Sequence, residues 1–142
     1  MNIMMKSKIV NLMLLLTCML FSPLSLAEEE TAQAKPQYSY YTLAPDITTN
    51  YVTQGNRLGY LRLQIDLMVI DPSLIKIVEE HSPLIRDAII TIIGRQPEAK
   101  VKSLAGREEI RQICLDTVNE LLIAETNQKL LTELLFTKYL YQ

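Results

Sequence analysis

Residues 58–70 read Leu-Gly-Tyr-Leu-Arg-Leu-Gln-Ile-Asp-Leu-Met-Val-Ile, and this stretch decides the fold. From Leu61 to Val69 every second residue is aliphatic, and the residues between them are Arg, Gln, Asp and Met. A period of two is typical of a β-strand with one buried face, because successive side chains leave opposite sides of the strand. The stretch therefore predicts a central strand that buries Leu61, Leu63, Ile65, Leu67 and Val69.

The chain before this strand favours extended structure. Residues 40–43 and 47–53 are rich in Tyr, Thr and Val, and Pro45 between them lacks the N–H group that a sheet ladder needs. The segment Gln54-Gly-Asn-Arg57 contains two residue types that tolerate positive φ, which predicts a hairpin turn into the central strand.

Helical signals follow the central strand. Asp71-Pro72 predicts a helix start and a helix to about Glu80, and Ser82-Pro83 predicts a second start, with a helix that ends at Gly94. The polar segment 95–102 contains Pro97 and is predicted to be a loop. Ser103 then caps an amphipathic helix whose apolar positions recur every three or four residues: Ile110, Ile113, Cys114, Thr117, Val118 and Leu121.

The charged positions of this last helix are expected to form a solvated face, with a subunit contact as the alternative. They are Glu108, Glu109, Arg111, Asp116 and Glu120. Residues 130–142 predict a final strand paired with the central one. Residues 40–142 thus form one α+β domain, with a small antiparallel-containing sheet packed with two to three helices.

The N-terminus carries a targeting signal. Lys6 and Lys8 precede an apolar run, and Ser25-Leu-Ala27 offers small residues for cleavage before three glutamates. This pattern is typical of a signal peptide over residues 1–27. The alternative is a retained anchor, although about 18 apolar residues span only about 27 Å as a helix. Residues 28–39 are acidic and polar and predict a flexible linker. Both alternatives place residues 40–142 beyond the inner membrane, on the periplasmic side.

Composition and motifs argue against several classes of function. The net charge is −2 and the basic residues are scattered, so no nucleic-acid partner is expected. The chain lacks a nucleophile elbow, an HExxH motif and a Gly-rich phosphate loop, so we expect neither an enzyme nor a small-molecule substrate, metal or cofactor.

His81 is the only histidine and is interpreted as a hinge residue, and Cys114 as a core residue. The tyrosines at 38, 40 and 41 are interpreted as strand formers.

Three segments resemble the FliL family of flagellar basal-body proteins. They are residues 83–90 (Pro-Leu-Ile-Arg-Asp-Ala-Ile-Ile), 106–111 (Gly-Arg-Glu-Glu-Ile-Arg) and 135–142 (Leu-Phe-Thr-Lys-Tyr-Leu-Tyr-Gln). Their order and the preceding hairpin also match the family. The resemblance marks family-motif residues with a structural role: Pro83, Arg86, Asp87, Gly106, Arg107 and Phe136.

The resemblance implies a bitopic protein with a periplasmic domain of the stomatin-like α+β kind. It implies a non-enzymatic protein that associates with the flagellar stator units and other basal-body proteins, assembles into a homo-oligomeric ring at the inner membrane surface, and supports rotation, motility and chemotaxis. The short apolar segment of this chain departs from that pattern. Two alternatives keep the domain but change its role: an exported ligand-binding module, and a general membrane scaffold of the stomatin type.

Overall fold

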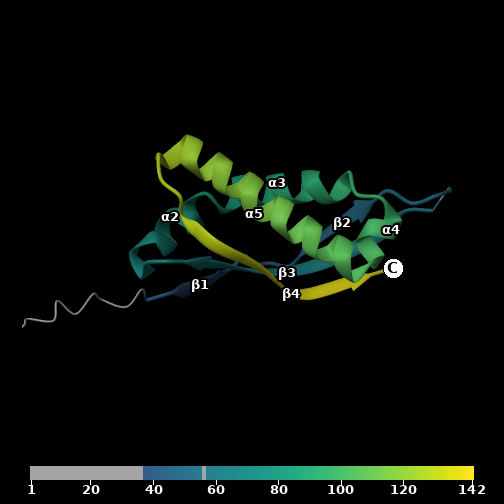
Figure 1. The fold of residues 1–142 in the computed structure, drawn as a ribbon, viewed down its shortest axis with the longest axis horizontal. Helices are drawn as coiled ribbons and strands as arrows, with labels where there is room; N and C mark the ends of the chain where they lie inside the picture. Colours follow the sequence, from purple (N-terminus) through teal and green to yellow (C-terminus); the bar gives the residue numbers. More distant parts are fainter. Residues whose placement is uncertain (1–36, 56) are drawn as a thin grey trace, which may run out of the picture. The chain divides into compact units, whose positions relative to one another are not determined.

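The computed structural model describes residues 37–55 and 57–142. The predicted signal or anchor, and all but the end of the predicted linker, lie outside these residues. The described chain contains one antiparallel sheet (Figure 1). Its strands are β1 (Ser39–Thr42), β2 (Ile47–Tyr51), β3 (Gly59–Val69) and β4 (Leu131–Tyr141).

Strand β3 is the central strand, as predicted. β4 pairs along one edge of β3, while β1 and β2 share the other edge, with Thr42 opposite Asp66 and Ile47 opposite Leu63. Between β1 and β2 the chain leaves the ladder at Pro45, after a cis peptide bond. The alternating face of β3 is buried at every predicted position, which confirms the facing of the strand.

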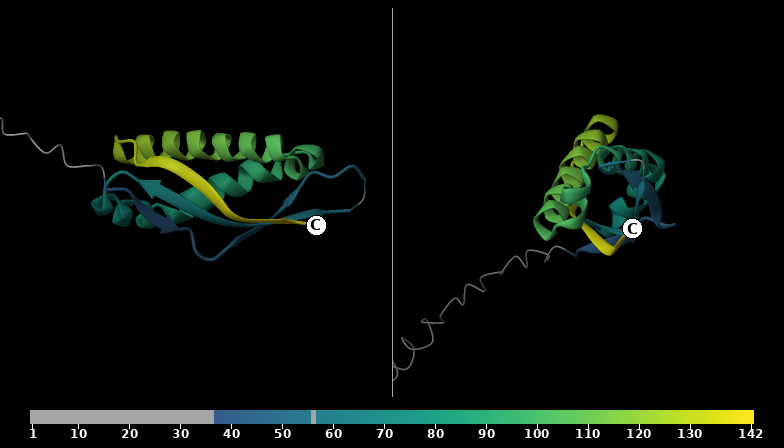
Figure 2. Two further views of the ribbon diagram at one scale, coloured as in Figure 1. Left: turned by 60° about the horizontal axis from the view of Figure 1, so that its bottom comes forward. Right: turned by 90° about the vertical axis from the view of Figure 1, so that its right-hand side faces the viewer.

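Strand β4 pairs with β3 through two irregularities. The register skips one residue of β4 between Gln64 and Ile65 and another between Met68 and Val69. The two extra residues are Thr137 and Thr132, and their hydroxyls donate to the carbonyl oxygens of Gln64 (3.3 Å) and Met68 (3.1 Å). Bulges of this kind increase local twist, and β4 curves strongly along its length (Figure 2).

Helices cover one face of the sheet and form a second layer (Figure 2). In the described residues a 3₁₀ turn precedes four α-helices: η1 (Pro72–Leu74), α2 (Ile75–Glu80), α3 (Ser82–Gly94), α4 (Glu98–Lys102) and α5 (Leu104–Thr126). Both predicted caps are present. The Asp71 carboxylate accepts from the Ser73 N–H at 2.8 Å, and the Ser103 hydroxyl oxygen accepts from the Gly106 N–H at 3.0 Å.

The prediction of a loop over 95–102 is wrong from Glu98 onward, because α4 begins there. Pro97 is extended and stands just before the helix, so its missing N–H costs no helical hydrogen bond. Glu98 and Lys102 form an i,i+4 ion pair of 2.5 Å, and Val101 is buried in the core. This extra helix is why the fold exceeds the expected two to three helices.

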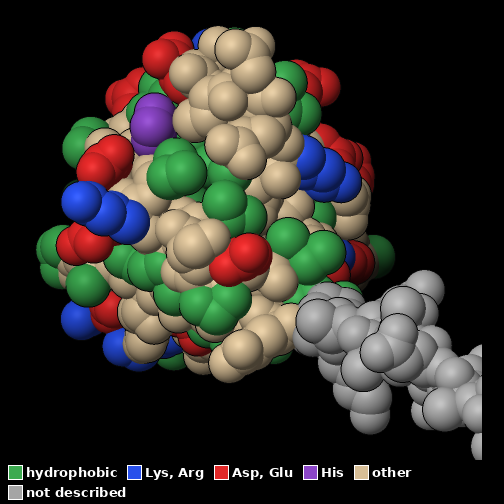
Figure 3. Space-filling model, turned by 90° about the vertical axis from the view of Figure 1, so that its left-hand side faces the viewer, with side chains coloured by type: hydrophobic (Ala, Val, Ile, Leu, Met, Phe, Trp, Pro, Cys, Tyr) green, Lys and Arg blue, Asp and Glu red, His purple; other side chains and the backbone are tan. Residues whose placement is uncertain are grey.

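The α+β class and the antiparallel sheet are otherwise as predicted. The core lies between the two layers, and Cys114 is fully buried in it, as expected for a small core residue. Figure 3 views the end of the domain at which the described chain begins. Hydrophobic, acidic and basic side chains alternate on that face, and neither sign of charge forms a broad patch. No helix of the described residues is both long and apolar enough to cross a membrane.

Candidate interaction surface

The family-motif residues separate into two groups in the structure. In the first group, Pro83 occupies the first turn of α3 and Arg86 reaches back to the connection between β1 and β2. The Arg86 guanidinium donates to the carbonyl oxygens of Pro45 (2.6 Å) and Leu43 (3.4 Å). Charge-assisted hydrogen bonds of this kind fix an irregular loop to a helix. Asp87 differs, since it is exposed and forms no hydrogen bond or ion pair with any other described residue.

The second group joins the start of α5 to the end of β4. A Cβ atom at Gly106 would lie only 2.1 Å from the Lys100 carbonyl oxygen, so only glycine fits where α5 passes α4. Arg107 donates to the Phe136 carbonyl oxygen at 3.0 Å, and its guanidinium lies 4.9 Å from the centre of the Tyr139 ring. The structure thus brings Arg107 to Phe136, while the neighbouring Gly106 contacts α4, and both contacts serve packing within the domain.

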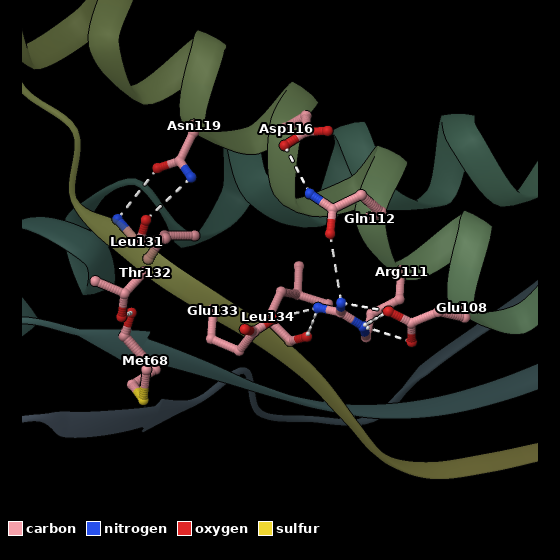
Figure 4. Close-up of polar contacts among 10 residues, drawn as sticks. All are labelled: Met68, Glu108, Arg111, Gln112, Asp116, Asn119, Leu131, Thr132, Glu133 and Leu134. Carbon is pink, nitrogen blue, oxygen red and sulfur yellow. Dashed lines mark hydrogen bonds and ion pairs between the residues drawn. The ribbon is translucent and has the colours of Figure 1, made fainter.

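Two further side chains of α5 bind the same strand, and sequence reasoning missed both (Figure 4). The Asn119 amide donates to the Leu131 carbonyl oxygen and accepts from the Leu131 N–H, each at 3.1 Å. Arg111 donates to the Leu134 carbonyl oxygen at 3.0 Å and also pairs with Glu108 and Glu133. These bonds satisfy outward-facing backbone groups of β4, which has no strand on its outer side among the described residues.

Arg111 therefore does not belong to the solvated face on which it was predicted, and that interpretation is wrong for this residue. Its side chain is 17% exposed, and the hydrogen bond that it donates to Glu108, with Glu133 adding to the effect, holds the pKa of Arg111 above its ordinary value. One signal was available in the sequence. Arg107, Arg111, Cys114 and Val118 recur at spacings of four, three and four, which places Arg111 on the buried stripe.

An ionic cluster ties the connection between β1 and β2 to the outer face of the sheet. The Asp46 carboxylate accepts from Lys138 on β4 at 2.8 Å and from Arg62 on β3 at 2.9 Å. The hydrogen bond from Lys138, followed by that from Arg62, holds the pKa of Asp46 below its usual value. The cluster joins three segments that are far apart in the sequence, which is a structural role.

His81 and Cys114, whose residue types often serve in catalysis or metal binding, contribute to the fold here. His81 stands between α2 and α3, and its Nδ1 lies 2.7 Å from the Ile77 carbonyl oxygen, so it occupies the predicted hinge. Burial raises the pKa of the Cys114 thiol to about 12, which makes this thiol a poor nucleophile. Among the residues that the structure describes, no three His, Cys, Asp or Glu side chains gather as a metal site would require.

A groove of about 520 Å³ runs along the solvent side of the seam between α3 and α5. Asp87, which forms no hydrogen bond or ion pair with another described residue, belongs to its wall. The remaining wall is largely apolar, and it is lined by Leu84, Ala88, Thr91, Ile92, Arg95, Gln96, Ile113, Thr117 and Leu121. A concave and largely apolar surface with a few polar groups is suited to bind another molecule.

Comparison with known proteins decides the family. The model of "Flagellar basal body-associated protein FliL" matches residues 40–142, from the second residue of β1 to the last residue of the chain. The chain belongs to the FliL family. A FliL relative, "Flagellar protein FliL" of Aquifex aeolicus (strain VF5), is 30% identical over 82 residues. That match covers 58% of this chain and 50% of the relative, so the chain spans about half the length of the FliL protein it matches.

Proposed function

We propose that this chain is a non-enzymatic accessory protein of the bacterial flagellar basal body, held at the periplasmic side of the inner membrane. The family match over residues 40–142 carries this proposal. In this proposal the domain has the stomatin-like form of its family, contacts the stator units and supports rotation, motility and chemotaxis.

The contacts of the motif residues support a role in protein association. These residues join elements of the domain to one another: Arg86 joins α3 to the β1–β2 connection, Gly106 allows α5 to pass α4, and Arg107 joins α5 to β4 at Phe136. A rigid domain of this kind is suited to present surfaces to neighbouring proteins. In the proposed mechanism the domains form a homo-oligomeric ring around a stator unit. The ring favours the ion-conducting state of the stator, which requires that it contact the two stator states with different free energies.

Deletion of the gene tests the proposal. We expect reduced swimming speed and reduced torque at high load, restored by the wild-type gene in trans. As a control for folding, the gene carrying Gly94→Ala should restore motility as well, because the nearest atom to an added Cβ there is 4.0 Å away. Unchanged motility after deletion, in a strain without a second gene of the family, would refute the proposed role.

The groove between α3 and α5 supports a second candidate, an exported ligand-binding module. Its volume of about 520 Å³ lies in the range of small-molecule sites. Native mass spectrometry of the purified full-length chain distinguishes the two. A co-purifying small molecule that is lost when Thr91, on the groove wall, is changed to Trp would favour the ligand-binding module.

A further inference from the structure

The groove between α3 and α5 has the dimensions of a helix-binding site. Leu84, Ala88 and Ile92 follow one another at intervals of four residues on α3, and Ile113, Thr117 and Leu121 do the same on α5. Residues four apart lie on one side of a helix, so the two rows form the two walls. At 1.5 Å per residue each row extends over about 12 Å, which matches an apolar stripe of two to three helical turns.

The charges around the groove are mainly acidic. Asp87 stands in the α3 wall, and the exposed Asp116 and Glu120 flank Thr117 and Leu121 on α5. The basic residue in the wall is Arg95, which follows the last residue of α3. It lies eight residues beyond Asp87 and so about 12 Å further along the helix axis. A helix dipole places positive partial charge at the N-terminus and negative partial charge at the C-terminus. A bound helix that runs parallel to α3 therefore meets Asp87 with its N-terminal end and Arg95 with its C-terminal end.

Two other occupants fit less well. A small ligand needs polar groups that converge on it, whereas the two charged side chains of the wall, Asp87 and Arg95, are eight residues and about 12 Å apart along the helix axis. A second copy that packs groove to groove with its α3 parallel to that of the first would bring the acidic rims of the two chains together, which like-charge repulsion opposes.

We propose that the α3–α5 groove docks an amphipathic helix of another protein, with an apolar stripe and basic flanks, lying parallel to α3. The inference is independent of the flagellar role, because it rests on the shape and charge of the groove alone. The bound helix buries its stripe between the two rows and places lysine or arginine side chains beside Asp87, Asp116 and Glu120. This is helix-in-groove recognition, in which anchors at i, i+3 or i+4 and i+7 supply the contact.

Three synthetic helical peptides of about 14 residues, roughly four turns, serve as probes. The first has a leucine stripe with lysine flanks, the second has the same stripe with glutamate flanks, and the third keeps the lysines but scrambles the stripe. Binding to the full-length chain in detergent is followed by fluorescence anisotropy. We expect the first peptide to bind, the second to bind about tenfold more weakly, and the third to show no saturable binding.

Two variants locate the site. Thr91→Trp fills the groove from an exposed position of its wall and should abolish binding, while Thr48→Trp makes the same change at an exposed position of β2 and should leave binding unchanged. Asp87→Lys should weaken the lysine-flanked peptide and strengthen the glutamate-flanked one. Thermal unfolding by circular dichroism confirms that each variant is folded.

Three outcomes would overturn the proposal. Equal affinity for the first two peptides would exclude recognition by charge, and binding unaffected by Thr91→Trp would place the peptide elsewhere. The third outcome concerns self-association, which sedimentation measurements without peptide compare between the wild type and Thr91→Trp. If Thr91→Trp changes the self-association of the chain, the groove is occupied by a second copy.

Discussion

Gly106 lies where the first turn of α5 passes the last turn of α4. A methyl group added there would lie 2.1 Å from the Lys100 carbonyl oxygen and 2.7 Å from the Ser103 hydroxyl oxygen. The first atom belongs to the backbone of α4 and the second to the residue that caps α5, so relief of the clash would move backbone and disturb this cap. The residue is therefore required by close approach, although its backbone conformation is ordinary.

We expect Gly106→Ala to lower the free energy of unfolding by about 1–3 kcal/mol, the usual range for overpacking. Urea denaturation followed by circular dichroism measures it. Gly94→Ala is the matched control, since its added methyl group would have 4.0 Å of space to the Asn50 carbonyl oxygen. Equal losses in both variants would show that a general cost of replacing glycine, and not the contact with Lys100, is responsible.

Asn119 has a role that depends on one neighbouring residue, because its amide forms hydrogen bonds with both backbone groups of Leu131. Asn119→Ala leaves a buried N–H and a buried C=O without partners, at about 1–3 kcal/mol for each unsatisfied group. Denaturant midpoints measure this loss. Gln112→Ala on the exposed side of α5 removes a bond to Asp116 and a 3.4 Å bond from Arg111, and it should change stability by less than about 0.5 kcal/mol.

The contact of Asn119 was not predictable from the sequence, and for Arg111 the spacing indicated a place on the buried stripe of α5 but not the atoms that it binds. A polar residue in an amphipathic helix faces solvent in most cases, and only the position of β4 beside α5 makes these side chains edge caps. Asp71 and Ser103 were predictable, because a cap bonds its own helix and the information is local.

At the scale of elements, β3 was the most predictable part of the chain. Its alternating pattern fixes which face is buried. By contrast α4 was missed, since five residues after a proline carry too little periodicity to distinguish a short helix from a loop. The groove could not be predicted either, because it depends on how closely α3 and α5 pack.

The facing of β3 gives a direct test. Ile65 is fully buried at the middle of the strand, so Ile65→Ala should cost about 2–5 kcal/mol of unfolding free energy. Gln64→Ala, one residue earlier on the opposite face, should cost far less. Thermal melts of the two variants make the comparison, and a larger loss for Gln64→Ala would contradict the described facing.

The ionic cluster of Asp46 predicts a pH dependence for the connection between β1 and β2. The hydrogen bond from Lys138, and then that from Arg62, lowers the pKa of Asp46 in the folded state from the ordinary value of 3.8. A lowered pKa contributes stability that is present above about pH 4 and is lost as the pH falls through the folded-state value.

Asp46→Asn should therefore be less stable than the wild type at pH 7, and the difference should vanish as the pH falls well below the ordinary pKa of an aspartate. Urea midpoints of the two proteins across this range provide the measurement. A difference that persists unchanged at the lowest pH would show that Asp46 acts through its size or a neutral hydrogen bond and not through its charge.

At the scale of the whole molecule, Cys114 reports on the integrity of both layers. It is fully buried between α5 and the sheet, and burial raises its pKa to about 12, so it is inaccessible and protonated near neutral pH. In a Cys18→Ser background we expect Cys114 to react with a thiol reagent at pH 8 only when the domain unfolds. Labelling in native buffer at the rate of a free thiol would mean that the helical layer opens without global unfolding.

The two bulges of β4 have a consequence for how this strand can vary in length. Because Thr132 and Thr137 have no partners opposite them on β3, each is a surplus residue in the register. Loss of Thr137 would leave Phe136 opposite Ile65 and Lys138 opposite Gln64, with every inward side chain still inward. A deletion elsewhere in the strand would shift the register by one residue up to the nearest bulge. The side chains between the deletion and that bulge would then change face. Homologous chains can therefore differ by one or two residues here without disturbing the interior, provided that the gap falls on a threonine.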